Sequence, residues 1–280
     1  MAGILYVVAT PIGNLEDVTF RALRVLREVA IIAAEDTRRT ARLLQHYSIS
    51  TPTTSLHEHN ERSRTPELIA RLERGDSVAL VSDAGTPVVS DPGGLVVAAA
   101  HAAGIRVEPV PGPSAAMAAV SASGLLADQI LFVGFPPRRS NDRKRWLAEL
   151  KEEPRLVVFF EAPHRIQASL ADMLEIFGDR VAAVGRELTK AHEELVVRPI
   201  SQHLQSLTEP RGEFTVVVSG AAPADSERPD VPDLPALLSE FGDMTNKGVG
   251  SRRQAVRLMA EKYRISTREM YQLLESGPDD

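Results

Sequence analysis

The stretch VALVSDAGTPVVSDPGG, residues 78–94, decides the fold, because it combines a strand, two tight turns and the start of a helix. Its first four residues, Val78–Val81, form a short apolar run bounded by turn residues. Such a run is typical of a strand that is covered on both faces. The chain is then expected to turn sharply, with Gly85 free to adopt a positive φ.

A second turn follows in the same stretch and leads into the apolar run 95–100. Ser90 or Asp91 is expected to cap the helix there, with Pro92 at its first position. In open α/β sheets, small ligands bind beyond the carboxyl ends of the strands. The stretch therefore predicts the floor of a ligand site, although a plain connection between a strand and a helix has the same signature.

The composition indicates an ordinary globular protein. The 280 residues are 43% hydrophobic and 25% charged, and this length predicts about two domains. The chain has no cysteine, which excludes disulfides and thiolate chemistry and fits a reducing compartment. Its first ten residues, MAGILYVVAT, are too short an apolar run for a signal peptide or a membrane span. We therefore expect a cytoplasmic protein that does not bind membranes.

Charge is distributed unevenly along the chain. The net charge is −6, yet residues 246–268 carry seven basic side chains and a single acidic one, so this segment has a net charge of +6 and the remainder −12. A basic segment on an acidic body predicts contact with a polyanion. A solvated helix face is the alternative interpretation. The basic residues are Lys247, Arg252, Arg253, Arg257, Lys262, Arg264 and Arg268.

The order of predicted elements divides the chain into four parts. Strands and helices alternate through residues 1–119, which predicts a mostly parallel sheet with helices on both sides. Residues 120–220 contain a run of strands and predict a second domain of α+β type with antiparallel strands. Residues 221–233 are rich in Pro, Ala and charge and predict a linker, and residues 234–280 predict three short helices.

Loops of one character follow the predicted strands. They contain Gly and Pro, which let a backbone approach a ligand, and Asp, Glu, Ser or Asn, which bind polar groups. Together they predict a single pocket. The loops are TPIGN (10–14), EDTR (35–38), LHEHN (56–60), residues 82–94, PGPSA (111–115) and EAPHR (161–165).

Other ligands and chemistries find less support. The chain has neither the glycine fingerprint of dinucleotide-binding proteins nor a P-loop, which disfavours NAD and ATP. His57 and His59 have no clear third partner, so hydrogen bonding is favoured over metal binding. Glu161, His164 and Arg165 are equally compatible with catalysis and with a structural cap and ion pair.

Eight segments, in order and spacing, are similar to one family. The sequence resembles the bacterial 16S ribosomal RNA (cytidine-2′-O)-methyltransferase I family of the tetrapyrrole methylase superfamily, from residue 4 to about residue 219. The three basic helices resemble that family's C-terminal extension. The segments are LYVVATPIGNLEDVTFRAL, AEDTRRT, LHEHN, VSDAGTPVVSDPG, VPGPSA, VGFPPR, FFEAPHRI and GRELTKAHEE.

The resemblance implies a class III S-adenosylmethionine methyltransferase with two α/β domains and a C-terminal helical extension. It implies that the enzyme acts as a homodimer, binds S-adenosylmethionine between its domains, and methylates the ribose 2′-hydroxyl of cytidine 1402 in 16S rRNA of the 30S subunit. No metal is required. The implied cofactor contacts are Pro11, Gly13, Asp83, Ala84, Gly85, Thr86, Ser114, Ala115, Phe135, Ala162 and Glu187.

The reaction needs a proton acceptor and a surface for RNA. A carboxylate within reach of the hydroxyl can take its proton, and Asp36, Glu58 and Glu161 are the candidates. Basic side chains are expected to hold phosphates. The predicted RNA-binding residues are Arg38, Arg138, Arg139, Arg143, Lys144, Arg145 and Arg165, with Arg252 and Arg253 on the basic helices.

Two alternatives remain open from the sequence. A methylase of tetrapyrroles or another small molecule would share the fold, but such a substrate needs no basic extension. The other alternative is a non-catalytic ribosome-associated protein that has kept a nucleotide-like pocket. The intact Gly and Asp loops disfavour it, and titration with the cofactor would distinguish it from an enzyme.

Overall fold

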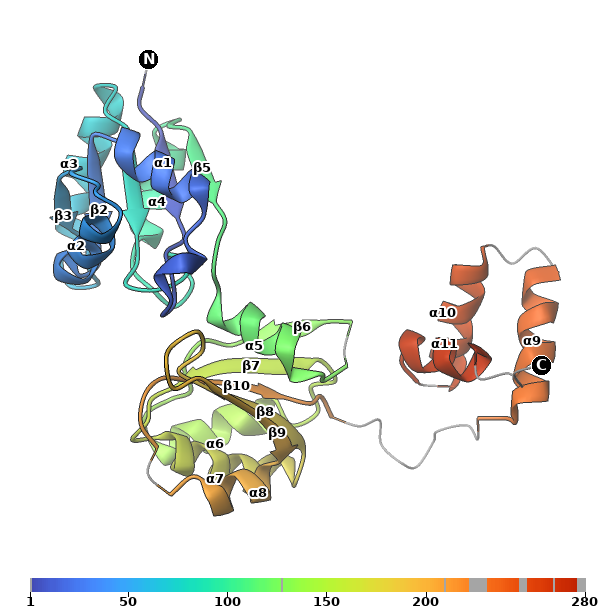
Figure 1. Cartoon of the computed structure of the whole chain (residues 1–280). Helices are drawn as coiled ribbons and strands as arrows, with labels where there is room; N and C mark the ends of the chain where they lie inside the picture. The colour runs from blue at the N-terminus through green and yellow to red at the C-terminus, as the bar shows by residue number, and fades with distance from the viewer. Residues whose placement is uncertain are drawn as a thin grey trace.

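The computed structural model describes residues 2–126, 128–208, 210–221, 231–246, 251–263 and 265–275. They form two five-stranded sheets, each covered by helices, and a group of three C-terminal helices (Figure 1). Most of the predicted linker, together with Lys247 and Arg264, lies outside the described residues. Among the described helices, none combines the length and the apolar character that a bilayer crossing requires.

The first sheet is entirely parallel, with the strand order β3-β2-β4-β1-β5. Its central strand is the β4 predicted from the apolar run at the start of the deciding stretch, and all four residues of β4 are buried. The five strands are β1 (Leu5–Val8), β2 (Ile31–Ala34), β3 (Thr53–Ser55), β4 (Val78–Val81) and β5 (Val107–Val110).

Both faces of β4 are covered, as predicted. Ala79 and Val81 pack into a core with residues of α1 and α2, whereas Val78 and Leu80 pack into a second core with residues of α3 and α4. This alternation follows from the geometry of a strand, in which successive side chains point to opposite faces. The four helices are α1 (Phe20–Glu28), α2 (Thr37–His46), α3 (Glu61–Glu73) and α4 (Gly94–Ala102).

The helix after β4 begins later than predicted, and its cap comes from elsewhere. The prediction that Ser90 or Asp91 caps the helix with Pro92 at its first position is wrong, because α4 begins at Gly94 and its cap residue is Gly93, with φ +118°. The acceptor for the free N–H groups is Glu61 of α3, which binds the N–H of Gly93 at 3.0 Å and that of Leu95 at 2.7 Å. A carboxylate at this position is also favoured by the helix dipole.

The second sheet is mixed, with the strand order β6-β7-β10-β8-β9. Only β6 and β7 pair in parallel, and the remaining pairs are antiparallel, as expected from the sequence. The strands are β6 (Ile130–Phe132), β7 (Leu156–Glu161), β8 (Val181–Arg186), β9 (Glu194–Pro199) and β10 (Phe214–Val218).

Helices cover both faces of the second sheet as well. The core on one face includes Ala116 and Ala119 of α5, and the core on the other includes residues of α6, α7 and α8. The chain crosses from the first sheet to the second through residues 111–114, between β5 and α5 (Figure 1). The helices are α5 (Ala115–Ser123), α6 (Ser140–Glu149), α7 (Ile166–Phe177) and α8 (Ile200–Ser206).

The three C-terminal helices, α9 (Leu234–Asn246), α10 (Arg252–Tyr263) and α11 (Thr267–Glu275), share a core of their own. The N–H of Glu269 donates to the Ser266 hydroxyl at 3.0 Å, so one of the two predicted caps of α11 is confirmed. Their core residues are Leu237, Val256, Met259, Ala260, Tyr263 and Met270.

Candidate active site

A cavity of about 730 Å³ lies where loops of the two sheets meet, within the size range of small-molecule sites. The loops after β2, β4 and β5 supply one wall, at the carboxyl ends of parallel strands. The opposite wall consists of residues after β6 and β7, together with residues 188, 190 and 213–215. The deciding stretch contributes Asp83, Ala84, Gly85, Thr86, Val89, Ser90 and Asp91.

The floor of the cavity is held by backbone hydrogen bonds between loops. Thr10 and Gly85 exchange two of them, at 2.8 and 3.0 Å, and Gly85 has the predicted positive φ of +82°. The hydroxyl of Thr86 donates to the carbonyl of Pro113 at 3.4 Å. The loops after β1, β4 and β5 therefore form one connected surface.

The segment between this floor and α4 has an unusual backbone. Val88 and Ser90 have φ values of +72° and +67°, which is rare for residues other than glycine and rarest for β-branched ones. Glu61 holds the downstream end of the segment through Gly93. On the other side of the cavity, a Cβ at Gly134 would lie 3.1 Å from the Ser90 hydroxyl, so the segment also contacts the second domain. Such strain persists only where the surroundings impose it.

The two domains also meet beside the cavity. A Cβ at Gly13 would lie 2.4 Å from Cγ of Lys190, so only glycine permits this approach. The N–H of Asn14 donates to the Thr189 hydroxyl at 3.0 Å. The carboxylate of Glu187 accepts from Nζ of Lys190 at 2.9 Å and thereby supports the contacting loop. Gly13 and Glu187 are thus at the domain contact.

Carboxylates at the ends of β2 and β4 interlock. The N–H of Asp83 donates to Glu35 at 3.2 Å, and the N–H of Asp36 donates to Asp83 at 2.9 Å. Arg39 pairs with the other oxygen of Asp83 at 3.4 Å. Burial raises the pKa of Glu35, and the hydrogen bond from Asp83 opposes part of that rise.

Asp91 is the carboxylate of the cavity whose acidity changes most. Burial, followed by repulsion from the Glu35 carboxylate, raises the pKa of Asp91 to about 6. The Ser82 hydroxyl opposes this rise through a hydrogen bond, and Asp83 adds to it. A carboxyl group with such a pKa exchanges protons near neutral pH, which suits acid–base chemistry.

The three predicted proton acceptors lie in different surroundings. Asp36 caps α2, accepting from the N–H of Arg38 at 2.8 Å, and hydrogen bonds from Arg38 lower its pKa to about 2. Glu58 is exposed and is not among the residues that line the cavity. Glu161 lines the cavity and is buried, accepting from the N–H of Ala162 at 2.8 Å and from the Ser169 hydroxyl at 2.5 Å.

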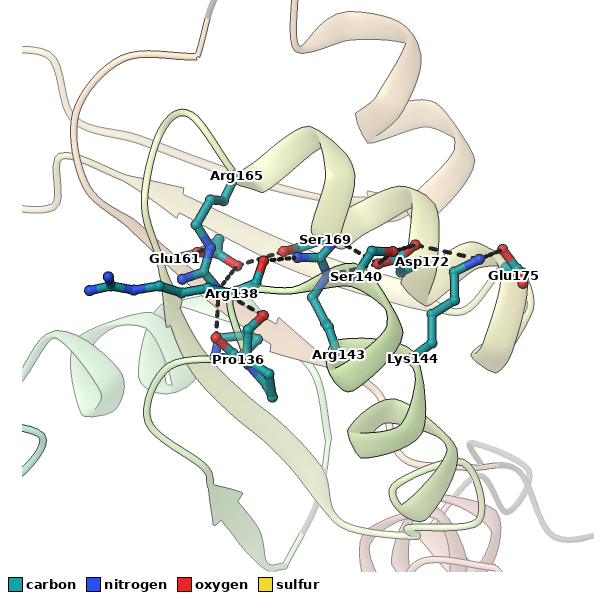
Figure 2. A network of polar contacts seen from close by, with 11 residues as sticks. Pro136, Arg138, Ser140, Arg143, Lys144, Glu161, Arg165, Ser169, Asp172 and Glu175 are labelled. Atoms are coloured by element: carbon teal, nitrogen blue, oxygen red, sulfur yellow. Dashed lines mark hydrogen bonds and ion pairs between the residues drawn. The ribbon is translucent and has the colours of Figure 1, made fainter.

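Glu161 also orients a predicted phosphate-binding residue. Arg165 lies 3.1 Å from its carboxylate and donates to the carbonyl of Pro136 at 2.5 Å (Figure 2). Through these two contacts Arg165 joins the end of β7 to the loop after β6, which carries Arg138 and Arg139. Both of these arginines are exposed.

The remaining predicted RNA-binding residues divide into buried and exposed groups. Arg143 is buried and pairs with Asp172 at 2.6 Å, and Lys144 pairs with Glu175 at 2.6 Å, so both hold α6 against α7 (Figure 2). Exposed members of the set are Arg38, Arg145, Arg252 and Arg253. Arg252 lies 5.6 Å over the ring of Phe241.

Most of the predicted cofactor contacts share the cavity wall. Pro11, Gly13 and Glu187 are not among the lining residues, whereas Asp83, Ala84, Gly85, Thr86, Ser114, Ala115, Phe135 and Ala162 are. Sequence reasoning missed Glu35, Arg39, Lys190 and Glu213, which also line the cavity. Glu35 and Arg39 flank the predicted Asp36 and Arg38. The sequence therefore identified the right loop, but it did not show which of its side chains point into the cavity.

Proteins of similar sequence identify the family of this chain. A protein of Synechocystis, ribosomal RNA small subunit methyltransferase I, is 46% identical to the chain over 274 residues, or 97% of each protein. The chain belongs to the ribosomal RNA small subunit methyltransferase I family. The family match extends to Pseudomonas aeruginosa, with 52% identity over 78% of this chain and 79% of the relative, and to Thermotoga maritima, with 49% over 78% and 99%.

The profile of the Tetrapyrrole (Corrin/Porphyrin) Methylases matches residues 4–203 of this methyltransferase. Uroporphyrin-III C-methyltransferase of Thermus thermophilus has the same fold, with a TM-score of 0.55 at 22% identity over 77% of this chain and 94% of that one. Diphthine synthase also shares the fold, with a TM-score of 0.58 at 15% identity over 78% and 90%. The predicted family, α/β fold and enzyme class are confirmed.

Proposed function

We propose that this chain transfers the methyl group of S-adenosylmethionine to the ribose 2′-hydroxyl of cytidine 1402 in 16S rRNA of the 30S subunit. One observation carries the proposal: a cavity lined by backbone-rich loops, in a chain that aligns over 97% of its length with a ribosomal RNA small subunit methyltransferase. A uroporphyrin-III C-methyltransferase of the same fold, with a TM-score of 0.56 at 19% identity, is complexed with S-adenosyl homocysteine.

The residues of the cavity fit S-adenosylmethionine, which supplies an electrophilic methyl group on a positively charged sulfur. Small side chains at Ala84, Ala115 and Ala162 leave the backbone accessible to a ligand. Carboxylates such as Asp83 suit a ligand with cationic groups, and Phe135, which is 55% exposed, offers an apolar surface. Methyl transfer depends largely on alignment, so a preformed site of this kind supplies much of the rate.

RNA contact rests on the exposed basic residues. Only Pro136 and Pro137 separate Arg138 and Arg139 from Phe135, which lines the cavity, and this short spacing places both arginines near its rim. Arg139 and Arg145 line a hollow of about 380 Å³ at the first turn of α6. In this proposal, Arg143 and Lys144 support that surface through α7, and Arg252 and Arg253 contact RNA from α10. Phosphate contacts of this kind position the substrate without selecting the base.

Transfer of labelled methyl from S-adenosylmethionine tests the proposal. The acceptors are 30S subunits that lack the modification, naked 16S rRNA and a tetrapyrrole precursor, each followed by digestion and separation of products. Label in 2′-O-methylcytidine from 30S subunits alone is the expected result. Label in the tetrapyrrole alone would overturn the substrate, and absence of both label and cofactor binding would overturn the enzymatic function.

The same proposal includes a homodimer that acts in the cytoplasm. Sedimentation equilibrium of the full chain is expected to give twice the mass of 30.5 kDa. A single-chain mass at concentrations above those used for the transfer assay would contradict the dimer.

A further inference from the structure

The cavity holds more carboxylates than the binding of one cation requires. Those of the described residues that line it are Glu35, Asp83, Asp91, Glu161 and Glu213. A 2′-hydroxyl that attacks a methyl group must release its proton, and a carboxylate within hydrogen-bond reach is suited to accept it. The five carboxylates differ in the cations and hydrogen-bond donors that contact their oxygens.

Three of them are bound to cations. Asp83 accepts from the N–H of Asp36 and pairs with Arg39 at 3.4 Å, so both of its oxygens are engaged. Glu161 pairs with Arg165 and also accepts from Ala162 and Ser169. Glu213 pairs with Lys190 at 2.9 Å. A carboxylate held by a cation or by several donors is a weak base, because these contacts stabilise its charged form.

Glu35 and Asp91 remain. Glu35 accepts the N–H of Asp83 at 3.2 Å, which ties it to the loop after β4. Asp91 interacts with the Ser82 hydroxyl, and no described cation forms an ion pair with it. The charged groups that act on Asp91 are Glu35 and Asp83, both acidic. Arg39 lines the same wall, where it pairs with Asp83.

The backbone around Asp91 is held in place from both sides. Ser90 precedes it with a φ of +67° and lies against Gly134 of the second domain. Gly93 follows two residues later, and its N–H is bound by the buried carboxylate of Glu61. A strained segment with anchors on both sides directs a side chain more precisely than a free loop does.

We propose that Asp91 accepts the proton of the attacking 2′-hydroxyl. As the new bond between oxygen and methyl forms, the O–H bond breaks and its proton passes to the Asp91 carboxylate, while the electron pair of the broken bond to the methyl stays on sulfur. Glu35 acts through Asp91 as a positioning residue, because its negative charge strengthens Asp91 as a base. The inference rests on the proposed ribose methylation.

Single-turnover methyl transfer to 30S subunits tests the assignment. The variant Asp91→Asn is expected to lower the rate by about 100-fold, the lower end of general-base contributions. Its affinity for S-adenosylmethionine, measured by calorimetry, should stay within about threefold, since removal of a base affects the step and not the binding. Asp76→Asn is the matched control, because Asp76 precedes the opposite end of β4 and pairs with Arg71.

The pH profile separates a base from a structural residue. The rate for the natural chain should rise with pH through a midpoint of about 6, the pKa of Asp91. Glu35→Gln should move that midpoint downward, because a repulsive charge is lost. Carbon NMR titration of the Asp91 carboxyl, in the natural chain and in Glu35→Gln, gives the same shift without an activity assay.

Two results would overturn the assignment. One is an Asp91→Asn rate within about threefold of the natural rate, with the fold intact by circular dichroism. The other is an Asp91 carboxyl that titrates near the ordinary value of about 3.9. Failure of the proposed function can be told apart from failure of the Asp91 assignment, because in that case the natural chain itself transfers no label to 30S subunits.

Discussion

The loops after β4 and β8 face each other across the cavity, and both contain two residues other than glycine with positive φ. These are Val88 and Ser90 in the first loop, and Glu187 and Thr189 in the second. The first loop is anchored by the buried Glu61, which binds backbone N–H groups. The second is supported by Lys190, whose side chain is 30% exposed and forms ion pairs near solvent.

The difference between these anchors indicates that the two loops differ in rigidity. Buried hydrogen bonds to backbone groups are hard to replace, whereas exposed ion pairs contribute little to stability. We infer that the β4 loop is the rigid part of the site and that the β8 loop, which contacts the loop after β1, is the adaptable part. Three substitutions with their controls test this inference, and a fourth tests the charge of Asp91 within the β4 loop.

The largest effect is expected from Gly93→Ala. The added Cβ would lie 2.6 Å from Cδ2 of buried Leu80, at a φ of +118°, and overpacking and backbone strain together should destabilise the chain by about 3 kcal/mol. Gly212→Ala is the matched variant beside the β8 loop, where the Cβ meets the side chain of Glu187, which can move. Chemical denaturation measures both, and equal losses would contradict the inferred difference.

Glu61→Ala should destabilise the chain by about 2 kcal/mol, because the N–H groups of Gly93 and Leu95 lose a charged, buried acceptor. Cofactor affinity should fall in the same variant, since the loop that it anchors lines the cavity. Glu61→Gln keeps one acceptor oxygen and should recover part of both losses. An unchanged calorimetric affinity in Glu61→Ala would show that the loop holds its shape without this anchor.

Asp91→Asn should stabilise the fold at neutral pH. Because the pKa of Asp91 in the folded chain is raised to about 6 from its ordinary value of 3.8, ionisation of Asp91 lowers stability as pH rises between these values. Solvent screening reduces the gain from its removal to about 1 kcal/mol. Thermal unfolding at pH 8 should show the gain, and it should vanish below pH 3.8, where both states bind the proton. A gain independent of pH would refute the ionisation argument.

The smallest effect is expected from Lys190→Met. Its ion pairs with Glu187 and Glu213 lie near solvent, so their loss should change the free energy of unfolding by less than about 1 kcal/mol. Salt should remove even this difference, because it screens exposed charges. Denaturation at low and high ionic strength measures it. A loss as large as that of Glu61→Ala would mean that the β8 loop is as rigid as the β4 loop.

The local sequence pattern was sufficient to predict the strands and part of the loop conformations. The apolar run Val78–Val81 predicted β4, and the turn residues after it predicted a positive φ at Gly85. The cap of α4 was predicted wrongly, because the acceptor comes from Glu61, about thirty residues earlier in another helix. Capping rules consider only residues next to the helix, so they cannot predict an acceptor from another helix.

By itself, the sequence determined which segments form strands and which loops carry polar residues, because periodicity and turn chemistry act over a few neighbouring residues. It also determined the family, through segments spread over the chain. Only the tertiary structure decided which carboxylates enter the cavity. The basicity of Asp91 depends on burial and on Glu35, which follows β2 and approaches Asp91 only once the chain has folded, with a smaller effect of Asp83 from the same loop.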